Sequence, residues 1–440
     1  MRKLIALMVM GMLVAGCSKT DNSATSATSG DDAAFQKKLQ EQLLDAKPGS
    51  VIEIPAGKHH LTSGLTLRVN GVTVRGAGME KTILSFKDQA AGPEGMLVYA
   101  SDLTLEGLTI EDSKGDGLKL NDGENITIRG VRVRWTDGPK VSNGAYGIYP
   151  VKCKNVLIED SVAIGASDAG IYVGQSHDVV VRRSRAEQNV AGIEIENTIS
   201  ADVYENTATN NTGGILVFNM PNLSQPGYGT RVFNNKVITN NLGNFAARGT
   251  AVASVPAGSG VVINSNSKVE IFDNDVVDNQ TANVIISSYF STGYFTEKGV
   301  SPNYDPYPRA IYVYGNRFKG GGDSPDGLDL KALKLAMYGL SGHLPDVLWD
   351  GYIDPKVASK GVMPADQRIC IQNGDIGVLN ADGPNKYKNP SNDVAPYKCE
   401  LAKLPAVVIP QISAAAAPAA PAPASAPAPA SAPASTPAKA

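Results

Sequence analysis

A short phrase that begins with glycine recurs four times in the middle of the chain. The phrases are Gly147-Ile-Tyr-Pro, Gly170-Ile-Tyr-Val, Gly192-Ile-Glu-Ile and Gly214-Ile-Leu-Val, and their spacings are 23, 22 and 22 residues. An internal period of about 20 to 50 residues is typical of a solenoid, in which each repeat forms one coil that stacks on its neighbours. A period this short, rich in Val, Ile and Asn and without a helical pattern, indicates a right-handed parallel β-helix.

The residues within each phrase predict how a coil is built. Two apolar residues flank a variable centre, as Ile171 and Val173 flank Tyr172. Because side chains alternate faces along a strand, the apolar pair points into the solenoid and the centre points outward. A second strand, such as Val156-Leu157-Ile158, and a shorter third strand follow in each coil. We therefore predict an all-β fold, a right-handed parallel β-helix with three short strands per coil and about ten coils.

Two columns of polar side chains are expected to run along this solenoid. The first contains stacked amides, at Asn189, Asn211 and Gln280. Amides in such a stack hydrogen-bond from one coil to the next. The second contains charges that alternate in sign, at Glu159, Arg182 and Glu205. Both columns stabilise the stacking and imply no chemistry.

Composition divides the chain into five segments. Residues 1–16 have the charged start and apolar run of a signal peptide, and residues 17–33 form a polar tether. The β-helix is expected over residues 34–320, beginning with an amphipathic helix at Ala34–Leu44 that caps the open ladder edge. A C-terminal capping region spans residues 321–410 and contains a helix-like stretch at Leu328–Leu340. Residues 411–440 form a disordered Ala/Pro-rich tail, which cannot bury a core.

Long loops interrupt the period at two places. One insertion lies between Gly214 and Gly260, where the spacing is about twice the normal one, and the second spans residues 287–309. The second insertion is rich in Tyr and Phe. Aromatic side chains of this number are expected to pack over one face of the solenoid rather than extend into solvent.

The N-terminal segment also predicts where the protein resides. Val14-Ala15-Gly16-Cys17 resembles the bacterial lipobox, in which the Cys thiol is lipidated and becomes the new N-terminus. Ser18 follows at a position where inner-membrane retention signals usually carry Asp. The resemblance therefore implies an anchor in the outer membrane through Cys17, on either its periplasmic or its surface face. An ordinary secretory signal is the alternative.

Charge and cysteine content exclude some classes of partner. The formal net charge is −3, and no basic patch with interleaved aromatic residues appears. We therefore expect no nucleic-acid partner. In an exported protein, Cys370 and Cys399 are expected to form a disulfide, whereas Cys153 lies inside a coil as a small, partly buried residue.

The outward centres of successive coils suggest a binding groove, formed by Lys119, Tyr149, Tyr172 and Glu194. The two aromatic rings can stack on sugar faces, and the lysine and the carboxylate can hold hydroxyl or carboxylate groups. These four residues are our candidates for binding a polysaccharide. The alternative is that outward strand positions simply favour Tyr and that charges there are solvated.

Part of the central solenoid resembles the mannuronan C-5 epimerases. The resemblance covers Tyr146-Gly147-Ile148-Tyr149-Pro150-Val151, the strand that follows, and the turn at Asp168-Ala169-Gly170. In that family the Tyr-Gly phrase runs into Asp-Pro-His, whose Asp and His belong to the catalytic centre. Here Tyr149 stands at the Asp position and Val151 at the His position. Because C-5 epimerisation needs one group to take the proton and another to return it, the resemblance supports the scaffold and argues against the reaction.

Other candidate sites carry weaker signals. Asp116, Asp122 and Glu124 are clustered carboxylates of the kind that Ca²⁺ prefers, but Asp is common at coil turns for backbone reasons. Glu194 and Glu196 share a strand face about 7 Å apart, a spacing compatible with inverting glycoside hydrolysis. We assign no catalytic residue and expect no metal or other cofactor. A lyase, an epimerase and a glycoside hydrolase all stay open.

The mature chain as a whole resembles a family of exported parallel β-helix repeat lipoproteins, related to the accessory β-helix proteins of nitrous-oxide reductase. The resemblance covers the capping helix, the coils and the Cys-containing C-terminal region. Members typically accompany an exported cytochrome-c-like protein, which this resemblance implies as a possible partner; the chain itself has no Cys-x-x-Cys-His for covalent haem. We therefore expect a lipid-anchored protein that binds a polysaccharide and is a candidate for processing it. The alternative is a non-catalytic scaffold for a cytochrome-like or envelope protein.

Overall fold

The computed structural model describes residues 29–292 and 303–415. The expected signal peptide, Cys17 and residues 18–28 of the tether lie outside the described residues, as does the tail from residue 416 onward. No helix among the described residues is long and apolar enough to cross a membrane.

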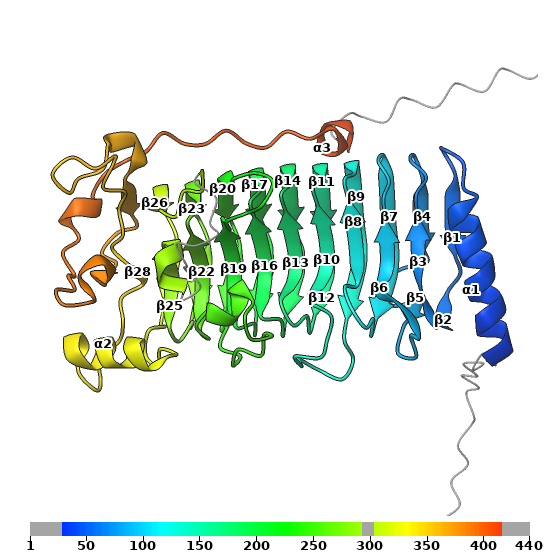
Figure 1. Ribbon diagram of the computed structural model, residues 1–440, viewed down its shortest axis with the longest axis horizontal. Helices are drawn as coiled ribbons and strands as arrows, with labels where there is room; N and C mark the ends of the chain where they lie inside the picture. Colours follow the sequence, from blue (N-terminus) through cyan, green and yellow to red (C-terminus); the bar gives the residue numbers. More distant parts are fainter. Residues whose placement is uncertain (1–28, 293–302, 416–440) are drawn as a thin grey trace, which may run out of the picture.

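Stacked coils of parallel strands form an elongated right-handed β-helix, with helix α1 (Ser29–Leu44) at one end (Figure 1). One face is an eleven-stranded sheet, and the remaining faces form a nineteen-stranded sheet. The latter is continuous because the long strand β9 (Glu124–Arg134) pairs with both of the strands that follow it in the next coil.

The strand boundaries follow the repeat. The eleven-stranded sheet contains β3 (Ser63–Leu67), β6 (Ala91–Val98), β8 (Leu118–Asn121), β10 (Tyr146–Val151), β13 (Ala169–Gly174), β16 (Ala191–Glu196), β19 (Gly213–Phe218), β22 (Ser259–Asn264), β25 (Ala282–Ser287), β28 (Val347–Trp349) and β30 (Val378–Asn380). One ladder of the nineteen-stranded sheet contains β1 (Val51–Ile54), β4 (Thr73–Gly76), β7 (Leu103–Glu111), β9, β11 (Lys154–Glu159), β14 (His177–Arg182), β17 (Ile199–Tyr204), β20 (Tyr228–Phe233), β23 (Ser267–Phe272), β26 (Arg309–Tyr314) and β29 (Ile369–Gln372). Its other ladder adds β2 (Gly57–His60), β5 (Thr82–Ser85), β12 (Val162–Ile164), β15 (Arg185–Glu187), β18 (Thr207–Thr209), β21 (Lys236–Ile238), β24 (Asp275–Val277) and β27 (Arg317–Lys319).

Short helices complete the described chain. Besides α1, the α-helices are α2 (Leu328–Tyr338), which lies between β27 and β28, and α3 (Pro410–Ala415). The single-turn helices are η1 (Ala251–Ser254), η2 (Tyr289–Thr292), η3 (Ala365–Gln367), η4 (Gly383–Asn385) and η5 (Ala395–Tyr397). Helix α2 begins at the expected residue and ends two residues earlier than expected.

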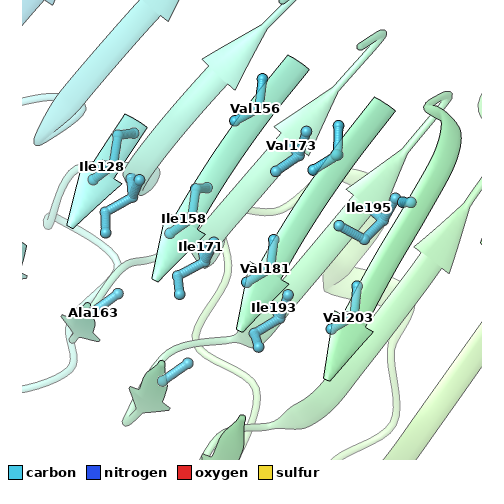
Figure 2. Close-up of a cluster of buried hydrophobic side chains, with 14 of the residues drawn as sticks. Ile128, Val156, Ile158, Ala163, Ile171, Val173, Val181, Ile193, Ile195 and Val203 are labelled. Atoms are coloured by element: carbon cyan, nitrogen blue, oxygen red, sulfur yellow. The ribbon is translucent and has the colours of Figure 1, made fainter. Parts of the chain in front are cut away.

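Apolar rows fill the interior, as the repeat predicts. Ile171 pairs in register with Ile148 on one side and Ile193 on the other, and all three are fully buried. Figure 2 shows Ile171 and Ile193 in parallel rows with side chains of the facing strands, such as Val156 and Val181. Each such burial stabilises the fold by about 1.5–3 kcal/mol relative to exposure. The core is therefore one continuous column along the solenoid axis.

Helix α1 caps the first coil. Leu39 and Leu43 are buried against the coil interior. The side-chain amide of Gln40 accepts from the Thr66 backbone N–H at 2.9 Å and donates to the Thr66 carbonyl at 3.0 Å. It thus replaces the strand that is missing at this edge, which leaves fewer ladder groups open for pairing with another chain. The helix begins at Ser29, five residues before the expected start.

The amide column is present, but one expected member is wrong. Asn189 donates to Asn211, Asn211 to Asn240 and Asn240 to Asn279, at 2.9–3.1 Å. The ladder therefore passes through Asn279, and the neighbouring Gln280 is exposed because it lies one residue beyond the inward turn position. A second buried ladder was not foreseen and contains Asn206, Asn235, Asn274 and Asn316.

The charged column is shorter than expected. Arg182 pairs with Glu159 at 2.7 Å, but its register partner in the following coil is Tyr204 and not Glu205. Glu205 has a φ of 57°, so it occupies the left-handed turn that ends the strand and falls out of the column. Arg182 instead donates to the Tyr204 hydroxyl at 3.0 Å.

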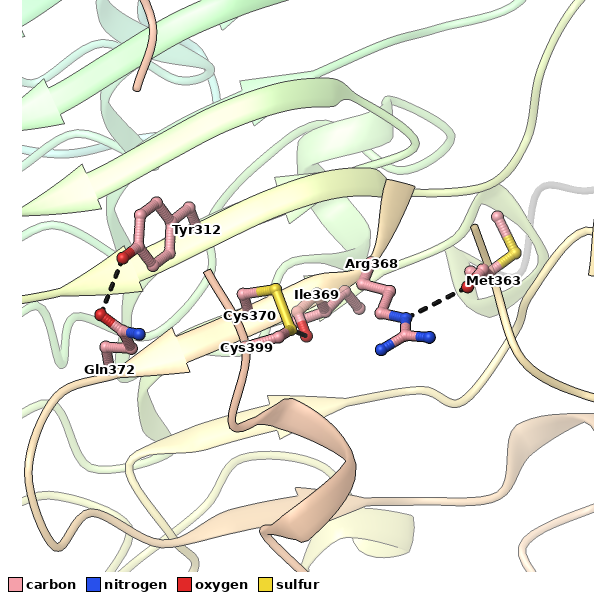
Figure 3. Close-up of a disulfide and its surroundings, with 7 residues drawn as sticks. All are labelled: Tyr312, Met363, Arg368, Ile369, Cys370, Gln372 and Cys399. Atoms are coloured by element: carbon pink, nitrogen blue, oxygen red, sulfur yellow. Dashed lines mark hydrogen bonds between the residues drawn. A yellow bond between two sulfur atoms is a disulfide. The ribbon is translucent and has the colours of Figure 1, made fainter. Parts of the chain in front are cut away.

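The solenoid continues past the boundary expected at residue 320. Strand β28 pairs with β25, β29 with β26, and β30 with β28, all in parallel register. The sequence signal is lost there because long excursions separate these strands. A disulfide joins Cys370 on β29 to Cys399, the pair expected from the sequence (Figure 3).

After Cys399 the chain runs back along the nineteen-stranded sheet as far as α3, which lies beside β9 and β11 (Figure 1). The backbone N–H of Leu404 donates to Glu270 at 3.0 Å, and that of Val407 donates to Asp202 at 3.1 Å. Ile409 is buried with Leu157 on the outer face of the sheet. We call residues 400–412 the strap. The expected start of the tail, residue 411, lies inside α3, where the Gln411 side-chain amide donates to the Asn155 carbonyl at 2.6 Å.

Candidate functional site

The four residues predicted to bind a ligand lie on neighbouring strands of the eleven-stranded sheet. Lys119 on β8 pairs in register with Tyr149 on β10, and Tyr172 on β13 pairs with Glu194 on β16. The Tyr149 and Tyr172 rings meet edge to face, with centroids 5.0 Å apart. The repeat thus places all four on the outer face, as the alternation of side chains predicts.

The expectation of an open groove fails at two of these positions. Tyr172 is 4% exposed and Glu194 is 1% exposed. The cause is the insertion after β21, because Val252 and Val255 of this loop join Tyr172 in one buried apolar cluster. Lys119 and Tyr149 lie at the edge of the covered region and stay partly exposed. The outer face therefore has an accessible end and a covered end.

The accessible end is aromatic and carries one cation. The ring of Tyr146 lies 4.5 Å from that of Tyr149 and 4.4 Å from that of Tyr172. The Lys119 ammonium lies 4.9 Å from the Tyr149 ring centroid, and it pairs with Asp116 at 3.5 Å and Glu94 at 3.9 Å. Tyr146 was not among the predicted binding residues. Its position at the start of β10, just before the phrase glycine, is the signal that could have identified it.

The covered end contains three carboxyl groups, those of Asp168, Glu194 and Glu196. Burial raises the pKa of Asp168 to about 8, and repulsion from Glu196 and Asp116 adds to the effect. Burial also raises the pKa of Glu194 far above its ordinary value, with further repulsion from Asp168 and Glu196. Burial raises the pKa of Glu196 as well, although the Tyr172 hydroxyl donates to it at 2.6 Å. Three carboxyl groups that repel one another in this way are not all ionised at neutral pH.

This arrangement can store and transfer protons. A neutral carboxyl group donates a proton or a hydrogen bond, whereas an ionised neighbour accepts one. Burial, together with Asp116 and the other nearby carboxylates, raises the pKa of Tyr149 to about 12, so its hydroxyl is a neutral donor at physiological pH. Asp168 was noted in the sequence only as part of a turn. Its role in the cluster depends on tertiary burial, which the local sequence does not reveal.

The carboxylates considered for Ca²⁺ do not converge. Asp116 faces Lys119 and accepts from the Tyr146 backbone N–H at 3.2 Å. Asp122 is exposed in a turn with a φ of 56°, and Glu124 pairs with Lys154 at 3.2 Å. Within residues 29–292 and 303–415, no group of three or more His, Cys, Asp or Glu side chains is arranged to hold a metal ion.

The chain belongs to the right-handed β-helix proteins. The family model described as "Right handed beta helix region" matches residues 70–224 and 137–298, which together cover about half of the chain. A comparison with curated protein sequences finds no significant match.

Several solved structures are similar in fold. The A-module of mannuronan C-5 epimerase AlgE4 from Azotobacter vinelandii is 17% identical, with 78% of this chain and 90% of that chain covered and a TM-score of 0.48. The AlgE6 A-module from the same organism is 20% identical over 66% and 83% of the two chains, with a TM-score of 0.44. The DFA-IIIase of Arthrobacter chlorophenolicus A6 is 13% identical over 72% and 87%, with a TM-score of 0.45. At these identities the similarity concerns the fold alone.

Proposed function

We propose that this protein is a lipid-anchored β-helix protein of the bacterial outer membrane that binds a polysaccharide on the outer face of its eleven-stranded sheet. The observation that supports this best is the composition of one cluster on that face. Three tyrosine rings in mutual contact lie next to the buried carboxyl groups of Asp168 and Glu194 and the partly exposed one of Glu196, and none of these carboxyl groups forms an ion pair with a described residue. Such a cluster serves recognition better than it serves stability.

The accessible end of the cluster is suited to binding a sugar, and the covered end to proton transfer. Tyrosine rings at the accessible end offer apolar faces and hydroxyl groups to a sugar, and Lys119 offers a donor to its oxygens. At the covered end, carboxyl groups with strongly raised pKa values mark a candidate for proton transfer to or from a bound saccharide. Asp168, Glu194 and Glu196 are therefore the groups we propose for processing, in place of the Asp-Pro-His that is missing at residues 149–151.

A binding experiment with two matched pairs of variants tests this proposal. The full chain in detergent is applied to a glycan array, together with its Tyr149→Ala and Lys119→Ala variants. Each variant should lower binding by about tenfold or more, because it removes a stacking surface or a donor. The controls are Tyr228→Ala and Lys268→Ala, since Lys268 lies 5.6 Å from the Tyr228 ring centroid in an equivalent pair on the other sheet. The controls should bind as the unmodified chain does.

Tyr172→Ala is not a suitable test. The side chain is buried, so its truncation opens a cavity that costs about 3–5 kcal/mol and confuses binding with folding. Unchanged binding in both Tyr149→Ala and Lys119→Ala contradicts the proposal. If no glycan binds and the full chain co-purifies with an exported haem protein, the result supports the alternative of a non-catalytic scaffold.

A further inference from the structure

The outer face around the tyrosines is rich in carboxyl groups. Five carboxyl groups gather there, at Glu94, Asp116, Asp168, Glu194 and Glu196, and the ammonium group of Lys119 is the cation that the described residues pair with them. Lys119 already pairs with the first two. The last three form no ion pair with any described residue, so any negative charge that they carry is left without a cation and repels further negative charge.

Two other buried carboxylates of the solenoid form ion pairs with cations of the chain. Glu111 is fully buried and pairs with Lys58 and with Arg134 at 2.9 Å. Burial alone raises its pKa, but the hydrogen bonds from these two cations lower it below the ordinary value. Glu159 is buried as well and pairs with three arginines, at 2.6–2.7 Å. Glu111 and Glu159 are thus compensated by cations of the solenoid itself, and the buried Asp350 by hydrogen bonds from Ser288 and Ser291 at 2.6–2.7 Å.

Glu194 lacks any such compensation. Its Oε2 atom is buried and has no hydrogen-bond partner, and the side chain is 1% exposed. A buried, unpaired polar atom costs about 1–3 kcal/mol, and more if it is charged. Asp168, which is 8% exposed, and the partly exposed Glu196 lie close enough to Glu194 to repel it. The carboxyl group of Glu194 therefore has no positively charged partner among the described residues.

We infer that the saccharide recognised by this face carries free amino groups, as an oligomer of 2-amino-2-deoxy sugars does. This inference rests on the proposed function. An ammonium group reaches the cluster at Glu196, beside the Tyr172 hydroxyl, while the sugar ring lies against Tyr146 and Tyr149. Charge-assisted hydrogen bonds of this kind are about twice as strong as neutral ones. A polyuronate brings carboxylates to a face that already holds five carboxyl groups, and like charges at an interface reject a ligand.

Calorimetric titration of the full chain in detergent tests the inference with three hexasaccharides of equal length. They are a glucosamine oligomer, its N-acetylated form and an oligomannuronate. The glucosamine oligomer should bind about tenfold or more tighter than the N-acetylated form, and the oligomannuronate weakest of the three. Glu196→Gln should remove the preference for the amine, so that the glucosamine oligomer and its N-acetylated form bind this variant with equal affinity. Glu205→Gln, at an exposed turn, is the matched control and should keep the preference.

The outcomes separate the inference from the proposed function. Tightest binding of the oligomannuronate, or equal affinity for the amine and its N-acetylated form, overturns the amino-sugar inference and leaves carbohydrate binding intact. Binding of none of the three together with an empty glycan array overturns both. Because the preference is measured on the unmodified chain, the test does not depend on whether Glu196→Gln folds.

Discussion

Asp168→Asn should make the protein more stable at neutral pH. Asp168 is 8% exposed, and burial with repulsion from Glu196 and Asp116 raises its pKa from 3.8 to about 8. A carboxyl group whose pKa is higher in the folded state costs stability as the pH rises. The cost is absent below the unfolded pKa and grows until the pH reaches the folded value. Asparagine resembles the neutral acid in shape and never ionises, so the variant escapes this cost.

The magnitude follows from the interval between the two pKa values. Each pH unit within it corresponds to about 1.4 kcal/mol, and pH 7 lies about three units above the unfolded pKa. The cost at pH 7 is therefore about 4 kcal/mol as an upper bound. Asp168 repels Glu194, whose own pKa falls when Asp168 is neutralised. We expect a net gain of about 2 kcal/mol in the free energy of unfolding at pH 7, shrinking towards zero at pH 4.

Urea unfolding followed by the fluorescence of the buried Trp135 measures this difference at pH 4, 5.5 and 7. Asp122→Asn is the control, because Asp122 is exposed in a turn, and it should change stability by less than about 0.5 kcal/mol at every pH. The reasoning is refuted if Asp168→Asn is less stable than the unmodified chain at pH 7, or if the difference between them does not vary with pH.

Two further predictions concern the devices that hold the coils together. Asn240→Ala breaks the amide ladder and leaves buried partners unpaired, so it should lower the free energy of unfolding by about 2–4 kcal/mol in urea titrations. Gln280→Ala is the control and should change the free energy of unfolding by less than about 0.5 kcal/mol. Equal effects of the two substitutions would contradict the ladder as observed. Replacing Cys370 and Cys399 together by Ser opens a loop of 29 residues, which should cost about 3 kcal/mol and speed hydrogen exchange at the Leu404 amide in the strap. Unchanged exchange at that amide would show that the strap is held without the disulfide.

The fold could be predicted from the sequence because every coil of a solenoid carries the same pattern of residues. The phrase around Ile171 specifies the same inward pair, outward centre and turn as the phrase around Ile193, so each coil supports the interpretation of the next. The predictions are wrong where a shift of one residue decides whether a side chain belongs to a strand or to the turn after it. Glu205 is expected in a strand column, but the strand ends one residue earlier and the turn takes Glu205. Period alone does not locate such an end.

The site was less predictable because it depends on a loop that has no period. The register gives the direction of Tyr172 and Glu194 correctly, but exposure is decided by Val252 and Val255, which lie about 60–80 residues later in the chain. The raised pKa of Asp168 has the same origin. A turn aspartate is ordinary in isolation, and only its burial near Glu196 makes it unusual.

Equivalent positions in different coils of a solenoid can be compared, so a residue that departs from the pattern of its neighbours is easily recognised. Glu159 and Glu194 are both buried glutamates on outward strand positions, yet the first is surrounded by arginines and the second has an unpaired oxygen. Stability alone favours arginine beside Glu194 or an apolar residue in its place, and Leu216 stands at the equivalent position of the next coil. The fold therefore does not require a carboxyl group at residue 194. Retaining it without compensation makes sense if a positively charged ligand completes the cluster.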